Sequence, residues 1–177
     1  MILSDKAIQS LIDSGRLVVK DRVPDAVQPC SVDLTMGSEA LIVKYWNTEG
    51  VLDFDTPMDH QKISGKEIII PPQSFILAAT KEYIELPNDV AAFVEGRSSI
   101  GRMGLFIQNA SVVVPGFRGT LTLELYNANI LPIRLRAGRK ICQLIFFKMD
   151  QPAGQPYQGK YQNQKKTTAT KAFLEKK

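Results

Sequence analysis

The chain has 177 residues, of which 44% are hydrophobic and 23% are charged. These values are typical of a globular protein, and the length fits one domain of ordinary size rather than two large ones. The formal net charge is +4, but six lysines lie in the last 18 residues, so the rest of the chain is close to neutral. This distribution argues against a protein that coats duplex nucleic acid and is compatible with a small anionic ligand.

The N-terminal residues predict the one clear helix of the sequence. Ser4 can cap it, Asp5 suits its first turn, Ile8 and Leu11 share one face, and Gly15 ends it. Past residue 24 the pattern changes to short strands separated by Gly, Pro and Asn. The predicted strands are Ser31–Leu34, Glu39–Lys44, Lys66–Ile70, Ser74–Thr80, Val90–Glu95, Leu105–Ile107, Gly119–Asn127, Ile133–Leu135 and Ile141–Lys148.

The segment Thr120–Tyr126 has the clearest strand pattern, because its leucines alternate with polar side chains and so point to one face. Many short strands with little helical pattern predict a mainly β fold, a distorted barrel or sandwich of the jelly-roll type. From Gln151 onward the composition shifts to Gln, Lys, Thr, Gly and Pro. Such a tail has too little apolar surface to fold alone, and a frayed terminus is one interpretation of it.

Two cysteines and one histidine limit the chemistry of the chain. They cannot form a disulfide framework or, within one chain, a zinc site of the usual kinds, so we expect a reducing compartment and no zinc. Cys30 and Cys142 are predicted to be small core residues, and His60 a surface residue in a polar loop. No signal sequence opens the chain and no apolar run approaches the ~20 residues of a membrane span, so we expect a soluble cytoplasmic protein without membrane contact.

The stretch Glu95–Gly104 is the most informative part of the sequence. It places Arg97, Ser98, Ser99 and Arg102 among three glycines, directly after an apolar strand. Hydroxyl groups and free backbone N–H groups at the start of a short helical turn form an anion site, and arginines add charge-assisted hydrogen bonds. A solvated surface turn is the alternative, but two arginines that flank a Ser-Ser pair favour phosphate binding.

Two acidic residues lie within apolar strands. Glu124 occupies the middle of the Leu-alternating strand, where a carboxylate is costly unless it is paired or faces a polar cavity. From this pattern alone, a glutamate on the solvated face of an edge strand is the simpler interpretation. Asp33, in Ser31–Leu34, leaves the same possibilities open.

Four ordered motifs resemble those of the dCTP deaminases of the dUTPase superfamily. They are QPCSVDL at 28–34, EGRSSIGRMG at 95–104, PGFRGTLTLELYN at 115–127 and YQGKYQNQ at 157–164. The segments Phe106–Ala110 and Lys140–Leu144 are especially similar to bacillus-like members, some of which also hydrolyse dUTP to dUMP. The resemblance covers nearly the whole chain.

The resemblance implies a homotrimer of distorted β-barrels with active sites between the subunits. Residues 1–150 form the dUTPase-like barrel under this interpretation, and residues 151–177 form a C-terminal tail that closes over the nucleotide. The implied ligand is dCTP or a related pyrimidine deoxynucleotide, with Mg²⁺ bound mainly through the triphosphate and water. No nucleic-acid partner is implied.

The resemblance also implies roles for individual residues. Glu124 is the implied general acid/base, and Ser98 and Arg102 shape the catalytic site. The implied nucleotide-binding residues are Arg97, Ser98, Ser99, Ile100, Gly101, Arg102, Val114, Thr122, Leu123, Glu124, Gln143, Tyr157, Lys160 and Gln164. Of these, Thr122 and Leu123 are expected to present their backbone to the base and the sugar.

A deaminase with this composition must activate water without a metal. Zinc nucleobase deaminases need a His/Cys ligand set and a Pro-Cys-x-x-Cys pattern, and this sequence has neither. A buried glutamate can take the proton from a water molecule that attacks C4 of cytosine, and can then protonate N3 and the departing ammonia.

Two positions depart from the family's pattern. The family normally has an Asp ten positions before the catalytic Glu, and here that residue is Val114. A valine can neither accept a proton nor bind a hydroxyl group, which argues against hydrolysis of dUTP. Lys166 stands where bacillus-like members usually have Gly, which bears on how the tail closes.

Three functions remain open. The main expectation is a zinc-independent dCTP deaminase that forms dUTP and ammonia. The first alternative is a bifunctional enzyme that also removes diphosphate and forms dUMP, and the second is a nucleotide-binding paralogue whose activity is reduced or altered because of Val114.

Overall fold

Antiparallel strands make up most of the computed structural model, which describes residues 1–45, 50–108 and 112–175. In chain order the elements are α1 (Asp5–Asp13), β1 (Val18–Lys20), β2 (Val27–Gln28), β3 (Ser31–Val43), β4 (His60–Ser64), β5 (Glu67–Ile70), β6 (Phe75–Glu85), β7 (Val90–Gly96), α2 (Ser98–Gly101), β8 (Leu105–Gln108), β9 (Arg118–Asn127), β10 (Ile133–Arg136), β11 (Lys140–Lys148) and a 3₁₀ turn, η2 (Ala172–Leu174). Residues 109 and 110 of the Phe106–Ala110 motif and the last two residues of the tail lie outside the described part. The prediction of a mainly β fold with a short N-terminal helix is confirmed.

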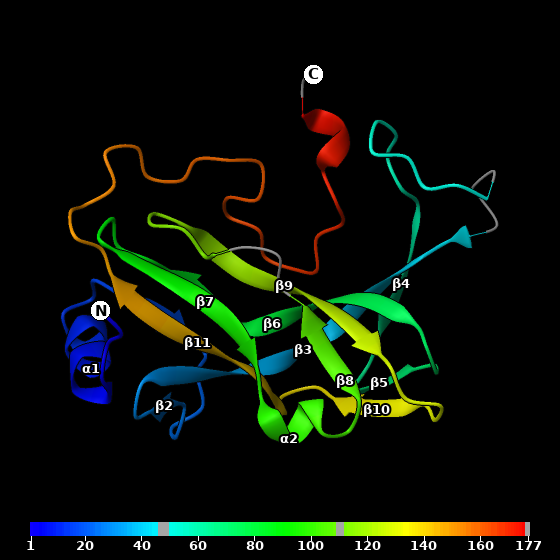
Figure 1. Ribbon diagram of the computed structural model, residues 1–177, viewed down its shortest axis with the longest axis horizontal. Coiled ribbons are helices and arrows are strands. Elements are labelled where there is room, and N and C mark those ends of the chain that lie inside the picture. Colours follow the sequence, from blue (N-terminus) through cyan, green and yellow to red (C-terminus); the bar gives the residue numbers. More distant parts are fainter. Residues whose placement is uncertain (46–49, 109–111, 176–177) are drawn as a thin grey trace.

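The strands form a nearly closed barrel (Figure 1). The main sheet follows the order β7-β11-β3-β6-β9-β8, with β1 attached to β6 and with β2 and β4 attached to β3. The barrel nearly closes where Ala92 of β7, at one end of this sheet, exchanges backbone hydrogen bonds of 2.9 and 2.7 Å with Val113, which follows β8 and precedes β9 in the chain. A second, two-stranded sheet pairs β5 with β10. Closure of this kind leaves few unpaired strand edges.

One long strand bends around the barrel where the sequence predicts two separate strands. The predicted strands Ser31–Leu34 and Glu39–Lys44 are one strand, β3, whose pairing with β6 shifts register between Met36 and Ala40. At Gly37 a Cβ atom would lie only 2.8 Å from the carbonyl oxygen of Ala79, so the two backbones approach there as no other residue would allow. The irregularity keeps one continuous strand in contact with different neighbours along its length.

The barrel interior and the N-terminal helix follow the predicted apolar patterns. Leu121, Leu123 and Leu125 are buried, in a core shared with residues of the neighbouring strands. Helix α1 buries Ile8, and the Ser4 hydroxyl accepts a hydrogen bond from the Ala7 N–H group as its cap. The helix therefore covers the barrel through the face that the sequence predicts.

Two single-residue predictions are wrong. Cys30 is exposed rather than part of the core, because it lies in the two-residue turn that joins β2 to β3. His60 lies in β4, paired with Val43, rather than in a loop, and its Nδ1 is 2.9 Å from the Met58 carbonyl oxygen. Strand β4 is mostly polar and only two of its residues are even partly buried, so its sequence lacks the alternating apolar pattern of a strand.

The C-terminal tail lies against the barrel and is not frayed over its described length. Residues 157–164 form backbone hydrogen bonds with residues 115–120, at the start of β9. Tyr157 packs against Phe117 with ring centroids 6.1 Å apart.

No helix in the described ranges has the length and apolarity to cross a lipid bilayer.

Candidate active site

A cavity of about 410 Å³ lies between β9, the residues that precede it and the tail. We call it the β9 cavity. Its volume is in the range of small-molecule sites. Five of the predicted site residues line it: Val114, Thr122, Glu124, Tyr157 and Gln164. The other lining residues are Leu77, Val94, Val112, Val113, Phe117, Leu121, Tyr161, Thr168, Ala169 and Thr170.

Glu124 is the one carboxylate among the described residues that line the β9 cavity. Its strand is not an edge strand, because Glu124 is paired with Leu77 of β6 on one side and Gln108 of β8 on the other. The interpretation as a solvated edge glutamate is therefore wrong. The side chain is partly buried, has no hydrogen-bond or ion-pair partner among the described residues, and has its pKa raised by that burial. Such a carboxyl can exchange a proton closer to neutral pH than an exposed one.

One wall of the cavity is made of valines. Val112, Val113 and Val114 precede β9 in succession, and Val113 is held by its backbone pairing with Ala92. Val114 presents an alkyl group to the cavity. This wall therefore offers apolar contact and no proton acceptor.

The tail forms another part of the wall and is hydrogen-bonded to β9. The Thr168 backbone N–H donates to the Thr122 hydroxyl at 3.1 Å, and the Gln164 side-chain amide donates to the Thr120 carbonyl at 2.7 Å. The Gln164 Oε1 atom is buried without a partner among the described residues. It is thus an acceptor available to a bound donor.

The predicted phosphate turn lies elsewhere. Arg97 precedes α2, Ser98, Ser99 and Arg102 are exposed, and Ile100 is buried as the anchor of the turn. The first N–H groups of a helix have no intrahelical acceptor, so the two serines bring both N–H and O–H donors to the surface. In Figure 1, α2 lies at the bottom of the barrel and the tail runs along the top.

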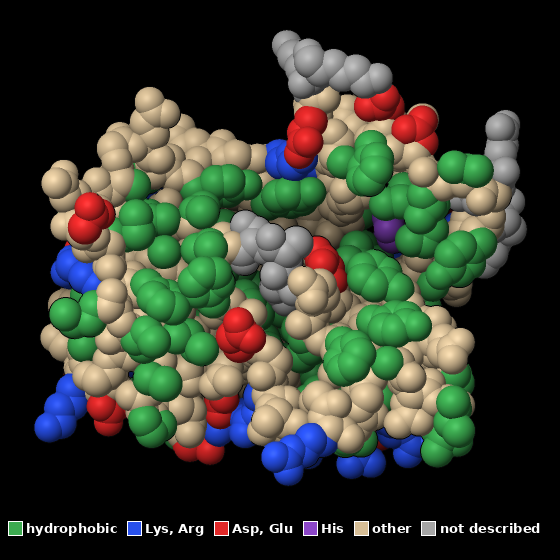
Figure 2. Space-filling view, viewed as in Figure 1, with side chains coloured by type: hydrophobic (Ala, Val, Ile, Leu, Met, Phe, Trp, Pro, Cys, Tyr) green, Lys and Arg blue, Asp and Glu red, His purple; other side chains and the backbone are tan. Residues whose placement is uncertain are grey.

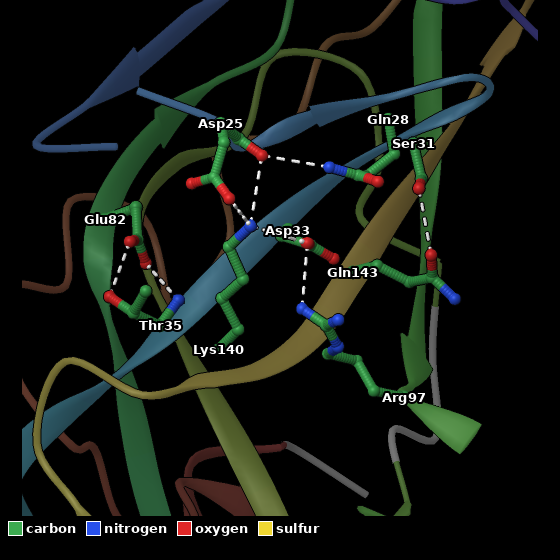
Figure 3. Close-up of polar contacts among 9 residues, drawn as sticks. All are labelled: Asp25, Gln28, Ser31, Asp33, Thr35, Glu82, Arg97, Lys140 and Gln143. Carbon is green, nitrogen blue, oxygen red and sulfur yellow. Dashed lines mark hydrogen bonds and ion pairs between the residues drawn. The ribbon is translucent and has the colours of Figure 1, made fainter. Parts of the chain in front are cut away.

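A charged cluster holds the base of this turn (Figure 3). The Asp33 carboxylate, 3% exposed, accepts a hydrogen bond from Arg97 at 2.8 Å and lies 3.2 Å from the Lys140 ammonium. Lys140 also donates to Asp25 at 2.7 Å, a hydrogen bond that raises the Lys140 pKa. The sequence leaves open whether Asp33 is paired or lies on a solvated face. In the structure it is buried and paired with Arg97 and Lys140.

Gln143 belongs to the same end of the barrel. Its strand neighbours are Asp33 of β3 and Glu95 of β7, and its side-chain oxygen accepts a hydrogen bond of 2.9 Å from the Ser31 hydroxyl. The predicted residues therefore fall into two sets within one chain, one around the β9 cavity and one around the Arg97–Arg102 turn with Gln143. None of the described residues that line the β9 cavity comes from that turn.

Two predicted residues lie in neither set. Lys160 donates to the Lys171 carbonyl at 3.1 Å and is paired with the Glu175 carboxylate. The Leu123 side chain is buried in the core, which leaves its backbone as the part that a ligand can contact.

Sequence reasoning missed several residues of these sets. Tyr161 and Thr168–Thr170 line the β9 cavity, and Lys140 pairs with Asp33. Tyr161 lies inside the YQGKYQNQ motif, which is a signal for it. The Thr-rich segment has no chemical pattern that could have identified it. Within the described ranges, no group of three or more His, Cys, Asp or Glu side chains is arranged to hold a metal ion.

Comparison with known proteins identifies similar chains over the full length. A family model described as dCTP deaminase-like matches residues 2–149. The chain is 48% identical to a protein of Persephonella marina named dCTP deaminase, dUMP-forming, with 99% of each chain covered. It is 46% identical to a protein of Aquifex aeolicus with the same name, over 99% of this chain and 97% of that one.

A similar fold occurs among solved structures. The structure of 2′-deoxycytidine 5′-triphosphate deaminase from Agrobacterium tumefaciens superposes with a TM-score of 0.65 at 25% sequence identity. The superposition covers 82% of this chain, which spans 47% of the Agrobacterium chain. The β-barrel of this chain is thus similar in both sequence and structure to proteins of one kind.

Proposed function

Because the chain belongs to the dCTP deaminase family, we propose that it converts dCTP to dUMP, releasing ammonia and diphosphate. The observation that carries this proposal is the name shared by relatives that are 46–48% identical over nearly the full chain, dCTP deaminase, dUMP-forming. That name favours the bifunctional alternative over our main expectation of an enzyme that stops at dUTP.

Glu124 is the proposed general acid/base of the deamination. Its carboxylate takes the proton from a water molecule that attacks C4 of cytosine, and returns protons to N3 and to the amino group that leaves as ammonia. The supporting features are its position in the β9 cavity, its lack of a partner among the described residues and the burial that raises its pKa. Thr122 and Leu123, its neighbours in β9, are the proposed backbone contacts of the base and sugar.

The Arg97–Arg102 turn is the proposed triphosphate site. Two arginines and two serine hydroxyls there supply charge-assisted hydrogen bonds of the kind that phosphates accept. Asp33 holds the Arg97 guanidinium in place, and Gln143 extends the same surface. When bound, Mg²⁺ would arrive with the triphosphate and neutralise part of its charge. Lys160 can contribute if a phosphate replaces Glu175 as its partner.

We further propose that each complete site combines the β9 cavity of one subunit with the Arg97–Arg102 turn of another, in a homotrimer. The separation of the two sets within one chain supports this. An exposed aromatic patch supports it too: Phe75, Tyr126 and Phe106 are neighbours across β6, β9 and β8, and are 41%, 38% and 54% exposed. Figure 2 shows hydrophobic side chains gathered over β8 and β9. Surfaces of this kind are commonly buried between subunits.

Product analysis tests the proposed reaction. The purified chain is incubated with dCTP and MgCl₂, and dCTP, dUTP, dUMP and ammonia are resolved over time, with Glu124→Gln as the inactive control. We expect ammonia and dUMP to appear together without accumulation of dUTP. Accumulated dUTP would restrict the activity to deamination, and binding without turnover would leave the paralogue alternative.

Val114 bears on the second proposed step, the hydrolysis of dUTP to dUMP and diphosphate. The attack of water on the α-phosphate benefits from a group that orients the water and takes its proton, and a valine cannot do this. If the natural chain accumulates dUTP, the variant Val114→Asp shows whether the valine is the cause. Formation of dUMP by the natural chain would instead mean that another group or water serves this step.

A further inference from the structure

Gln162, a residue that the sequence did not single out, joins the tail to the segment before β9 through both ends of its side-chain amide. Its Nε2 donates to the Gly116 carbonyl at 2.9 Å and to the Tyr157 carbonyl at 3.0 Å. Its Oε1 accepts from the Arg118 backbone N–H at 2.9 Å. All three partners are backbone groups, and the amide donates twice and accepts once.

Backbone hydrogen bonds on both sides of Gln162 hold the same two segments together. Tyr157 N–H donates to the Pro115 carbonyl at 2.9 Å, and Asn163 N–H donates to the Arg118 carbonyl at 2.7 Å. Asn163 adopts a φ of 61°, in the left-handed region that Asn enters more readily than most other non-glycine residues. Gln162 therefore lies in a turn of the tail backbone.

The two segments are packed so closely that a side chain at either of two glycines would clash. A Cβ atom on Gly116 would lie 2.6 Å from the Cβ of Pro156, and one on Gly119 would lie 2.8 Å from the Gln164 carbonyl oxygen. Both glycines have positive φ, 82° and 147°. These contacts suit the register that the tail adopts, in which Tyr157 and Gln164 line the β9 cavity.

We propose that Gln162 is a positioning residue, which holds Tyr157 and Gln164 at the β9 cavity before the nucleotide enters. This inference rests on the proposed function, since it assigns a part in nucleotide binding to a residue that does not line the cavity. Holding a lid in its bound arrangement removes the ordering cost from the binding step. Loss of Gln162 should therefore weaken binding without altering the chemistry that Glu124 performs.

Two substitutions and one matched control test the proposal in the full chain. Gln162→Ala removes all three hydrogen bonds. Gln162→Glu keeps the length and the acceptor but replaces the two donors with a negative charge that faces two carbonyl oxygens. Gln158→Ala is the control, because Gln158 is an exposed glutamine of the same tail with no side-chain hydrogen bond to a described residue.

Two measurements are made on each protein. Hydrogen exchange of the amides of residues 157–168 is followed without nucleotide, and steady-state kinetics are measured with dCTP. For both Gln162 variants we expect faster exchange, a KM for dCTP raised roughly tenfold or more, and a nearly unchanged kcat. The reason is that a docked tail stabilises the bound substrate and the transition state equally, so that undocking it raises KM alone. The control should match the natural chain in both measurements.

The outcomes separate this inference from the proposed function. Faster exchange with an unchanged KM would overturn the positioning role and leave Gln162 as a structural contact. Unchanged exchange would overturn it as well. If the natural chain does not turn over dCTP, the proposed reaction fails, and the inference is then decided by equilibrium binding of dCTP to the same variants, with tenfold weaker binding expected.

Discussion

Glu124 has a carboxylate without a partner among the described residues, in a cavity that raises its pKa by burial. We predict that Glu124→Gln lowers deamination by ~10²-fold or more, the usual effect of losing a general acid/base, and leaves the fold intact. In the natural enzyme, activity should rise with pH as this carboxyl ionises, and the rise should occur above the pKa of an ordinary glutamate. Ammonia release measured across pH, with circular dichroism as the control for folding, checks both statements. Equal turnover by the variant would remove Glu124 from the mechanism.

Glu82 is a fully buried carboxylate to which no step of the proposed reaction is assigned. It accepts hydrogen bonds from the Thr35 backbone N–H at 2.8 Å and from the Thr35 hydroxyl at 2.6 Å, and burial raises its pKa. Because its pKa is higher in the folded state, stability is greatest where the group is protonated in both states, and declines as the pH rises through the folded-state value. We predict that Glu82→Gln weakens this decline, so the variant gains stability relative to the natural chain as the pH rises above the ordinary Glu pKa. Urea unfolding of both proteins over a series of pH values tests this, and parallel pH dependences would contradict it.

At the scale of elements, Asp89 ties the segment after α1 to the start of β7 and the end of β11. Arg16 donates to both of its carboxylate oxygens at 2.7 Å, Lys148 also binds it, and these hydrogen bonds lower the Asp89 pKa to about 2. We predict that Asp89→Asn destabilises the fold by about 1–3 kcal/mol at neutral pH. The stabilisation is complete above the ordinary Asp pKa and is lost as the pH falls toward about 2, so the difference between the variant and the natural chain should shrink there. Chemical unfolding at pH 7 and pH 3 measures it, and a constant difference would rule out the ion pairs as the cause.

Removal of the C-terminal tail, residues 151–177, also gives a clear expectation. Tyr157 packs against the barrel core, while most of the other tail contacts are hydrogen bonds at the surface. We predict that a chain ending at Asp150 keeps the barrel folded and binds dCTP more weakly than the full chain. Thermal unfolding and equilibrium binding check the two parts separately. A truncated chain that binds dCTP as tightly as the full one would contradict the role of residues 151–177 as a lid.

The elements differ in how far the sequence predicts them. The central part of β9 and helix α1 follow directly, because leucine alternation and a capping serine are local signals. The bend of β3 does not, since it depends on the approach of Gly37 to Ala79, a contact between strands distant in sequence. Likewise, β4 has too few buried positions to show an alternating pattern.

The residues of the candidate site also differ in how far the sequence predicts them. The local pattern draws attention to the Arg97–Arg102 turn and to Glu124, because paired arginines and a carboxylate among leucines are unusual. For Glu124 the pattern alone favours a solvated edge residue, and only the family resemblance implies its catalytic role. The sequence does not predict the pairing of Lys140 with Asp33 or the contact of Gln162 with Gly116, because both require knowledge of which segments fold together.

At the scale of the whole molecule, the proposed trimer makes a prediction about mixtures of variants. If Glu124 and Arg102 of one site come from different subunits, then co-expressed Glu124→Gln and Arg102→Ala chains form some sites with both natural residues. We expect each variant alone to be nearly inactive, and random mixed trimers to recover about a quarter of the natural activity. Light scattering should give three times the chain mass of 19.7 kDa. No recovery in mixed trimers would mean that a site is built within one chain.

The tail packs closely against the barrel at Gly116 and Gly119, and it is covalently connected to the surface that it binds. Tethering sets an effective concentration of millimolar order for a short flexible connection, so the docked state can be populated even when the free peptide would bind weakly. The strength of docking then depends on contacts that begin at Ala153, whose N–H donates to the Asn88 carbonyl at 2.8 Å, and at Pro156, which packs against Gly116. Doubling the length of a flexible connection costs about 0.6 kcal/mol, so an insertion ahead of Ala153 should weaken docking only slightly.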